Sequence, residues 1–245
     1  MELTIVIPAY NEEMRIAPTL QAVDAFLRDQ GLRYEIVVVD DGSSDGTVAL
    51  VQAMMSEMPA LRCLESERNR GKGHAVRVGM LSATGEVRLM CDADGSMPPS
   101  EMPKLLRPIF SGAADIAIGS RYAEGASSDV NQPAWRVAWS RLANRIIQRS
   151  LVAGISDTQC GFKAFSAKAA EAVFAQATID GWSFDLEVLA LAKRLGFHIE
   201  EHGVAWTDDD RSRVSPVRDF IAVVREFLII RKNFKRGRYQ LALNS

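Results

Sequence analysis

Two aspartates one residue apart, Asp92 and Asp94, are the side chains best suited to chemistry in this sequence. They follow the apolar run Val87–Cys91, which predicts a strand, and alternate positions on an extended chain point to the same side. Paired carboxylates are hard oxygen ligands that suit Mg²⁺ or Mn²⁺ shared with substrate phosphates. A solvated acidic turn is the alternative, because a bare Asp-x-Asp is frequent by chance. The place at a strand end favours the metal site.

A second acidic pair, Asp40 and Asp41, follows the apolar run Glu35–Val39. Carboxylates at a strand end can accept hydrogen bonds from a nucleobase or a ribose, as they do in dinucleotide sites. The alternative is that this segment caps the next helix through Ser44 or Asp45, and both interpretations can hold together. We expect the pair to contribute to a nucleotide site.

The run Arg70–Gly73 joins two glycines to two basic residues and resembles a phosphate loop, with Lys72 as its ligand. No Ser or Thr follows the lysine, so this is not a Walker A motif, and no G-x-G-x-x-G follows the first predicted strand. The ATPase and dehydrogenase interpretations are therefore excluded. His74 is interpreted as a structural residue of the first helical turn.

The two acidic pairs share a position in the predicted fold with Pro8–Glu12 and Ser120–Arg121, because each of these groups stands where an apolar strand ends. Uniformly apolar strands that alternate with helices are typical of a mostly parallel sheet covered on both faces, and ligands of such sheets bind outside the carboxyl ends of the strands. The sequence thus predicts an α/β fold. The expected strands are 3–7, 35–39, 61–64, 87–91 and 116–120, and the expected helices are 13–29, 48–54, 74–82, one from 98, 134–151, 182–195 and 217–234.

Beyond Arg121 the pattern changes to a polar loop at 122–133, followed by amphipathic helices. Nine Lys and Arg residues against two acids make the segment 211–245 strongly basic, which indicates an anionic ligand or surface. We expect a catalytic domain at 1–210, with an interface helix at about 134–151, and a basic amphipathic segment at 211–245.

Composition excludes several classes of protein. With 245 residues, 47% hydrophobic, the chain has enough apolar material for an ordinary globular core. A net charge of −2 gives no case for a nucleic-acid binder. The three cysteines lie far apart without a C-x-x-C spacing, which favours a reducing compartment. We expect no signal peptide and no membrane span.

Several segments together resemble glycosyltransferase family 2, and those of the second half resemble its dolichyl-phosphate β-glucosyltransferase branch. The resemblance covers about residues 4–239 and implies a GT-A fold, a nucleotide-sugar donor and inverting transfer of a hexose to a polyprenyl phosphate, dolichyl or undecaprenyl. The segments are Ile5–Glu12, Val39–Thr47, Asn69–Gly73, Asp92–Asp94, Gly119–Arg121, Asp157–Lys163, Trp182–Glu187, Val204–Trp206 and Ser212–Pro216.

The resemblance also implies roles for single residues. Asp92 and Asp94 would hold Mg²⁺ or Mn²⁺ and the nucleotide, Arg121 would face phosphate, and Arg136 would contact the acceptor phosphate. These four are the predicted catalytic residues. Pro8, Tyr10, Glu12 and Asp41 would hold the uridine of the donor. The full set of predicted donor-binding residues is Pro8, Tyr10, Glu12, Asp40, Asp41, Lys72, Asp92, Ala93, Asp94, Arg121 and Arg213.

Two departures from the family pattern qualify this prediction. Ser96 stands where related mannosyl synthases place a metal-binding Gln, which weakens a GDP-mannose assignment. The membrane anchor of eukaryotic relatives has no counterpart here, so we expect peripheral attachment at the cytoplasmic face of a membrane. The helix with Trp135 and Trp139 and the basic C-terminal helix would provide it. The alternative assigns these apolar stripes to the core or to a homo-oligomer interface.

Glucose from UDP-glucose is the favoured donor sugar, with UDP-GlcNAc and GDP-mannose as alternatives. A soluble hydroxyl acceptor and a non-catalytic nucleotide-sugar-binding subunit are further alternatives. The chain lacks the Gln-x-x-Arg-Trp signature of synthases that glycosylate hydroxyls, which favours a phosphate acceptor. A phosphate monoester, with a second pKa near ~6, is mostly dianionic at neutral pH and needs no strong general base. The intact Asp92 and Asp94 argue against the non-catalytic subunit.

Overall fold

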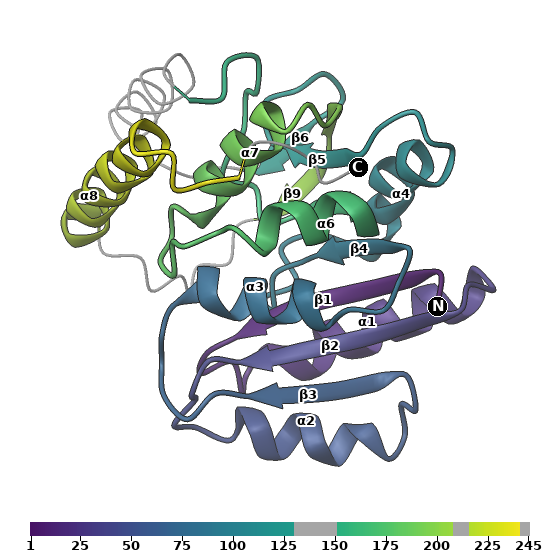
Figure 1. The fold of residues 1–245 in the computed structure, drawn as a ribbon. Coiled ribbons are helices and arrows are strands. Elements are labelled where there is room, and N and C mark those ends of the chain that lie inside the picture. Colours follow the sequence, from purple (N-terminus) through teal and green to yellow (C-terminus); the bar gives the residue numbers. More distant parts are fainter. Residues whose placement is uncertain (130–150, 208–215, 241–245) are drawn as a thin grey trace.

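The fold is built on a central sheet with the strand order β3-β2-β1-β4-β7-β5-β8. The computed structural model describes residues 1–129, 151–207 and 216–240 (Figure 1). Strands β6 and β9 form a separate parallel pair. The strands are β1 (Leu3–Ala9), β2 (Tyr34–Asp40), β3 (Leu61–Glu65), β4 (Val87–Met90), β5 (Ile116–Ser120), β6 (Ser127–Asp129), β7 (Lys163–Ser166), β8 (Ile199–Gly203) and β9 (Ala205–Thr207).

Helices cover both faces of the sheet, which explains why its central strands β1 and β2 are largely apolar. Successive residues of β1 pack on opposite faces: Val6 joins the core under α3, α6 and α7, while Ile5 and Ile7 join the core under α1 and α4. The helices are α1 (Ile16–Asp29), α2 (Thr47–Met55), α3 (Lys72–Ser82), α4 (Met102–Phe110), α6 (Ala167–Phe174), α7 (Phe184–Arg194) and α8 (Pro216–Lys235), with a 3-10 turn η1 (Pro99–Glu101).

The sheet is mostly parallel, and β7 is its antiparallel member. It pairs antiparallel with both β4 and β5, so those two strands run in the same direction although they never touch as neighbours. Strand β1 pairs parallel with β2 and β4, and β5 pairs parallel with β8. The carboxyl ends of β1, β2, β4 and β5 therefore meet at one edge of the sheet.

The predicted strands and the mostly parallel sheet are confirmed, and some boundaries are corrected. Helix α1 begins at Ile16 rather than at residue 13, and α3 begins at Lys72 rather than at residue 74. The loop predicted at 122–133 is wrong in part, because it contains β6. The predicted helix at 134–151 lies outside the described residues except for Leu151, which is buried in a turn.

The basic helix α8 packs against the same core as α6 and α7. Ile230 is fully buried in that core, and the Nδ2 of the buried Asn233 donates to Thr178 Oγ1 at 3.2 Å. Beyond the helix, the hydroxyl of Tyr239 donates to Glu187 Oε1 at 2.6 Å. No helix of the described part of the chain is long and apolar enough to cross a membrane. The division at residue 210 stays a prediction.

Candidate active site

The acidic pair lies in a turn directly after β4, and the backbone of this turn is fixed from two sides. Thr19 of α1 donates its hydroxyl to the carbonyl of Ala93 at 2.9 Å. Asp94 Oδ1 accepts the N–H of Ser96 at 2.9 Å, which closes the turn. The carbonyl of Ser96 in turn accepts the N–H of Thr207 in β9, at 3.1 Å. The aspartates are thus presented by a rigid turn rather than by a loose loop.

Both aspartates border a cavity of about 250 Å³ between α1 and the segment that follows β4. Met14, Pro18 and Met97 line its apolar part. A cleft that is largely apolar and carries a few convergent charged groups is the usual form of a small-molecule site. The cavity therefore marks the carboxyl edge of the sheet as the candidate active site.

Lys72, the first residue of α3, forms an ion pair with one member of the acidic pair, Asp92. Its Nζ lies 2.6 Å from Asp92 Oδ1. Burial acts to lower the pKa of Lys72, but the negative charges of Asp92 and Asp185 outweigh it and raise the pKa, so the side chain stays a cation. The structure thus places the predicted phosphate ligand beside the predicted metal ligand, and both roles stay predictions.

Behind Lys72 lies a buried ion pair between Asp185 of α7 and Lys163 of β7. Lys163 Nζ stands 2.6 Å from Asp185 Oδ1, and both side chains are almost fully buried. Burial raises the pKa of Asp185, and the two lysines oppose it. A buried pair of this kind is costly to break, because removing one partner leaves an uncompensated charge. The pair thus fixes two opposite charges near Lys72.

The acidic pair fits a Mg²⁺ or Mn²⁺ ion that is shared with a diphosphate. Such ions are held by one or two carboxylates together with substrate phosphates and water, so a third protein ligand is not required. No group of three or more His, Cys, Asp or Glu in the described ranges has the arrangement of a closed metal site. Asp92 and Asp94 are therefore the residues that would hold the ion.

The second acidic pair, Asp40 and Asp41, also lies at this edge, and its carboxylates accept backbone N–H groups of the neighbouring loops. Asp40 Oδ2 accepts the N–H groups of Gly42 and Ser43, whereas its Oδ1 is buried with no hydrogen-bond partner in the described part of the chain. Asp41 accepts the N–H groups of Arg70 and Gly71, with Gly71 N at 2.7 Å from Oδ2. The predicted nucleotide contacts of the pair stay predictions. The helix-cap alternative named the wrong residue, because Gly46 occupies the N-cap position of α2. Asp45, which precedes it, accepts the N–H of Thr47 at 3.0 Å.

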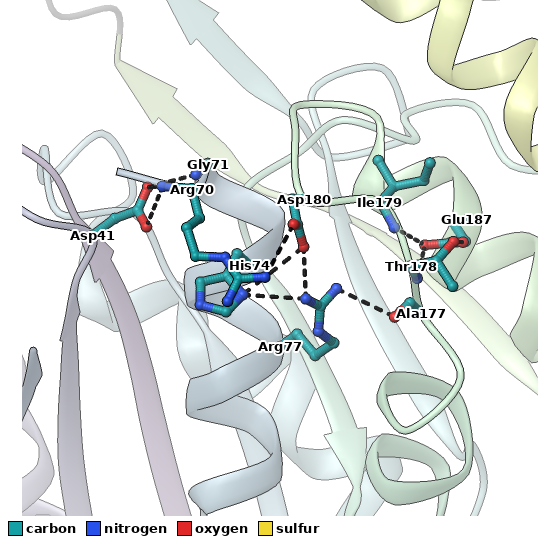
Figure 2. A network of polar contacts seen from close by, with 10 residues as sticks. All are labelled: Asp41, Arg70, Gly71, His74, Arg77, Ala177, Thr178, Ile179, Asp180 and Glu187. Carbon is teal, nitrogen blue, oxygen red and sulfur yellow. Dashed lines mark hydrogen bonds and ion pairs between the residues drawn. The ribbon is translucent and has the colours of Figure 1, made fainter. Parts of the chain in front are cut away.

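A polar network continues from Asp41 across α3 to the loop before α7, as Figure 2 shows. Asp180 Oδ1 lies 2.6 Å from Arg77 and its Oδ2 3.6 Å from Arg70, and its carbonyl accepts the N–H of His74 at 3.2 Å. Gly71 has φ +116°, and a Cβ there would stand 2.4 Å from the Asp180 carbonyl. The phosphate-loop glycine is needed for this approach. His74 lies in the first turn of α3 as expected, and its structural role stays a prediction.

The remaining residues predicted to bind uridine surround the same edge. Pro8 is buried within β1, and Tyr10 beyond it is 45% exposed. Glu12 is held by Arg15, whose two nitrogens each approach a carboxylate oxygen at 2.6 Å. Burial and the nearby Asp94 and Asp92 raise the pKa of Glu12 despite that ion pair. The three lie where the prediction placed them, and uridine binding by them stays a prediction.

Arg121, directly after β5, is held by a residue that the sequence analysis did not single out. Its Nε and one terminal nitrogen bind Asp157 at 2.7 and 2.9 Å, and its N–H donates to the same fully buried carboxylate. The guanidinium also faces the rings of Tyr122 and Trp206, at 5.7 and 5.4 Å. Burial opposes the charge, but Asp157 raises the pKa of Arg121, so the cation persists. Arg136 and Arg213 lie outside the described residues.

Sequence reasoning missed four residues around the site. Lys163, Asp157 and Asp185 lie within segments that the resemblance quoted, but each looks like an ordinary surface charge until its burial is known. Glu187 is also fully buried, and it accepts the N–H groups of Thr178 and Ile179, both at 2.8 Å. A charged residue at an apolar position of a helix, as in α7, was the available signal.

Comparison with known proteins relates this chain to one family. The model of the family described as Glycosyl transferase family 2 matches residues 4–174. Two relatives are each named dolichyl-phosphate beta-glucosyltransferase. That of Drosophila melanogaster is 35% identical over 99% of this chain and 78% of its own, and that of Homo sapiens is 33% identical over 98% and 78%.

Solved structures show the same fold. The glucosyl-3-phosphoglycerate synthase of Mycobacterium tuberculosis, in complex with Mn²⁺, UDP-glucose and glycerol 3-phosphate, superposes with a TM-score of 0.68 over 94% of this chain and 78% of its own, at 20% identity. The expected GT-A fold, an α/β architecture with a mostly parallel sheet flanked by helices, is thereby confirmed. From the matched family model, the near full-length relatives and the site at the carboxyl edge, it follows that the chain is a glycosyltransferase and belongs to glycosyltransferase family 2.

Proposed function

We propose that the protein transfers glucose from UDP-glucose to a polyprenyl phosphate, with inversion and with a divalent cation, at a membrane surface. One observation carries this proposal. Asp92, paired with Lys72, and the neighbouring Asp94 lie at the carboxyl edge of the sheet in a chain that is 33–35% identical to dolichyl-phosphate beta-glucosyltransferases over nearly its whole length. The Mn²⁺ and UDP-glucose named for a solved structure of the same fold support the choice of donor and metal.

The charges of the site suit the departure of a nucleoside diphosphate. The acceptor's phosphate oxygen forms a bond to the anomeric carbon as the bond from that carbon to UDP breaks, and UDP leaves with the electron pair. A cation held by Asp92 and Asp94 supplies Lewis-acid stabilisation of the leaving diphosphate. The ammonium of Lys72, 2.6 Å from Asp92, adds a fixed positive charge for the same purpose.

The phosphate acceptor requires cationic positioning rather than a general base, because it is mostly dianionic at neutral pH. Arg121, directly after β5, is the described cation proposed for this role, and Arg136 is the further one that the family pattern suggests. Asp157 fixes the orientation of the Arg121 guanidinium, whose Nε donates to Asp157 Oδ2 at 2.7 Å. An arginine anchored in this way keeps its charge and orientation with no cost of ordering when the acceptor arrives.

Helix α8 has an outer face that suits a membrane surface with anionic lipids. Val224 and Leu228 are 42% and 57% exposed and lie one turn apart. Arg225, Arg231 and Lys232 are exposed beside them. Apolar side chains ringed by basic ones are typical of helices that lie on a bilayer rather than cross it. An acceptor with a polyprenyl chain resides in such a bilayer.

The test is a donor panel with radiolabelled sugars. UDP-glucose, UDP-GlcNAc and GDP-mannose are each incubated with dolichyl or undecaprenyl phosphate and Mn²⁺ or Mg²⁺, and the product is extracted into organic solvent. We expect label in the organic phase from UDP-glucose and its loss in EDTA. Label that stays in the aqueous phase on a hydroxyl acceptor, or that enters the lipid from another donor, would overturn the corresponding part of the proposal.

A further inference from the structure

Trp182 stands exposed beside the candidate active site although the residues after it are buried. Its side chain is 51% exposed, whereas Ser183 and Phe184, which follow it, are 0% and 2% exposed. Covering an exposed indole is favourable, because an aromatic side chain buries about 150–250 Å² of surface when another molecule packs on it. The exposed ring is therefore available to a ligand.

Lys72 connects this ring to the acidic pair. The Nζ of Lys72 lies 5.4 Å from the centre of the Trp182 ring, and the same atom lies 2.6 Å from Asp92 Oδ1. The ring and the carboxylate are therefore separated by one ammonium group. In the proposed function, the diphosphate of the donor lies at the carboxylates, so the ring stands within reach of the sugar that the diphosphate carries.

The peptide that carries the ring is fixed on both sides. Glu226 of α8 accepts the N–H of Ser183 at 2.9 Å, and a Cβ on Gly181 would stand 2.0 Å from Glu226 Oε1. On the other side, Asp180 is bound to α3 through Arg77 and the N–H of His74, as Figure 2 shows. The indole is thus presented on a backbone held by two helices, which limits the cost of ordering it around a ligand.

We propose that Trp182 is the stacking platform for the hexose ring of the donor. This inference rests on the proposed function. The negative face of the indole attracts positively polarised groups, and the C–H groups on one face of a pyranose are of this kind. In a hexose whose ring hydroxyls are all equatorial, the face turned away from the diphosphate carries no protruding oxygen. An axial hydroxyl on that face would hold the sugar off the ring.

The experiment compares two ligands that differ by the sugar alone. The dissociation constants of UDP and UDP-glucose are measured by titration calorimetry in Mn²⁺ for the wild-type chain, Trp182→Ala and Trp182→Phe. We expect Trp182→Ala to weaken UDP-glucose about tenfold and to leave UDP within about twofold of wild type. Trp182→Phe should restore much of the difference. Phe110→Ala, which removes a ring of similar exposure (44%) at the end of α4, should change neither constant.

Glu226 supplies an independent test of the same platform. Glu226→Ala removes the acceptor that holds Ser183, so UDP-glucose should weaken severalfold while UDP is unchanged. In Glu226→Gln the amide oxygen can still accept the N–H of Ser183, so binding should recover. A merely structural role of this helix contact would weaken both ligands together.

Several results would overturn the inference. They are an equal loss of UDP and UDP-glucose in Trp182→Ala, no loss of either, or an unchanged UDP-glucose constant with a raised KM for the lipid phosphate. The last result would assign the ring to the acceptor. These outcomes are separate from failure of the proposed function, which is read from the absence of lipid product in the wild-type protein.

Discussion

Asp92 is held by contacts that differ in kind, and together they fix where its charge stands. Lys72 binds Oδ1, and the opposite oxygen packs so closely on Gly161 that a Cβ there would stand 2.0 Å from Oδ2. Any larger residue at position 161 would displace the carboxylate. Glycine is thus required by the close approach of an acid, with no special backbone conformation involved.

The exchange of Asp94 for asparagine tests the metal role at the scale of one residue. An amide oxygen can still accept the N–H of Ser96, so Asp94→Asn should keep the turn and a free energy of unfolding within about 1 kcal/mol of wild type. Removal of the negative charge should lower Mn²⁺-dependent transfer about 100-fold or more. The measurement is transfer rate against Mn²⁺ concentration, with urea unfolding in parallel.

The matched control is Asp115→Asn. Asp115 also accepts one backbone N–H, that of His198 at 2.9 Å, but it precedes β5 at the opposite edge of the sheet. Transfer should be unchanged in this variant. Full wild-type transfer in EDTA, or equal losses in the two variants, would contradict the metal role of Asp94.

At the scale of elements, the side chain of Glu35 in β2 connects this strand to three neighbouring segments. Its carboxylate accepts hydrogen bonds from Thr4 of β1 and from Thr84 before β4, and it binds Arg62 of β3 at 2.9 Å. Burial alone would raise the pKa of Glu35, but these bonds outweigh it and lower the pKa to about 2. The charge therefore stabilises the packing of β1, β2 and β3.

The pH dependence of this contribution has a definite sign. The pKa of Glu35 is about 2 in the folded state against 4.5 in the unfolded chain, so the unfolded state binds more protons as the pH falls. The stabilisation is complete above pH 4.5 and is lost as the pH falls from 4.5 towards 2. We expect Glu35→Gln to lower the free energy of unfolding by about 1–3 kcal/mol at pH 7 and by clearly less at pH 3.

Urea unfolding at the two pH values checks this prediction, with the exposed Glu57→Gln as the control. The control should be within about 0.5 kcal/mol of wild type at both. A deficit in Glu35→Gln that is the same at pH 7 and pH 3 would show that the charge of Glu35 is not what stabilises the strands.

Strands that are continuous apolar runs, and helices with apolar residues at helical spacing, were predictable from the sequence. Short or polar elements were not. The five apolar strands and α1 followed from spacing because both faces of the sheet are covered. Strand β7 is four residues long and begins with Lys163, a residue that is seldom buried, so no pattern marked it. Strand β8, Ile-Glu-Glu-His-Gly, lies at the edge of the sheet, where polar residues are tolerated.

The site was predictable as far as motifs at strand ends could indicate it. Asp92, Asp94 and Lys72 meet as expected, because parallel strands bring their carboxyl ends together. The partners Asp157, Lys163 and Asp185 were not singled out, because only burial shows that a charge far along the chain is paired. Local spacing carries no information about such long-range pairing.

The proposed membrane face is tested at the scale of the whole molecule. Leu228→Glu places a negative charge on the outer face of α8, where the wild-type leucine is 57% exposed. Binding to vesicles that contain anionic phospholipid should fall about tenfold, because the change removes apolar contact and adds repulsion. Cosedimentation with anionic and neutral vesicles at two salt concentrations measures it.

The control is Leu81→Glu, a leucine of similar exposure (45%) in the last turn of α3. It should leave vesicle binding unchanged, and wild-type binding should weaken at higher salt. Equal binding to neutral and anionic vesicles, or a defect of the same size in Leu81→Glu, would assign the exposed face of α8 to another role.

The antiparallel strand β7 constrains how the polypeptide can be made. It fills the space between β4 and β5 but is translated more than forty residues after β5, so a nascent chain that ends before Lys163 holds two strands without a common neighbour. Unpaired strand edges recruit other chains, and pairing over such a distance is slow. We therefore expect ribosome-arrested fragments that stop short of this strand to depend on chaperones, and the segment before β7 to resist production as an isolated unit.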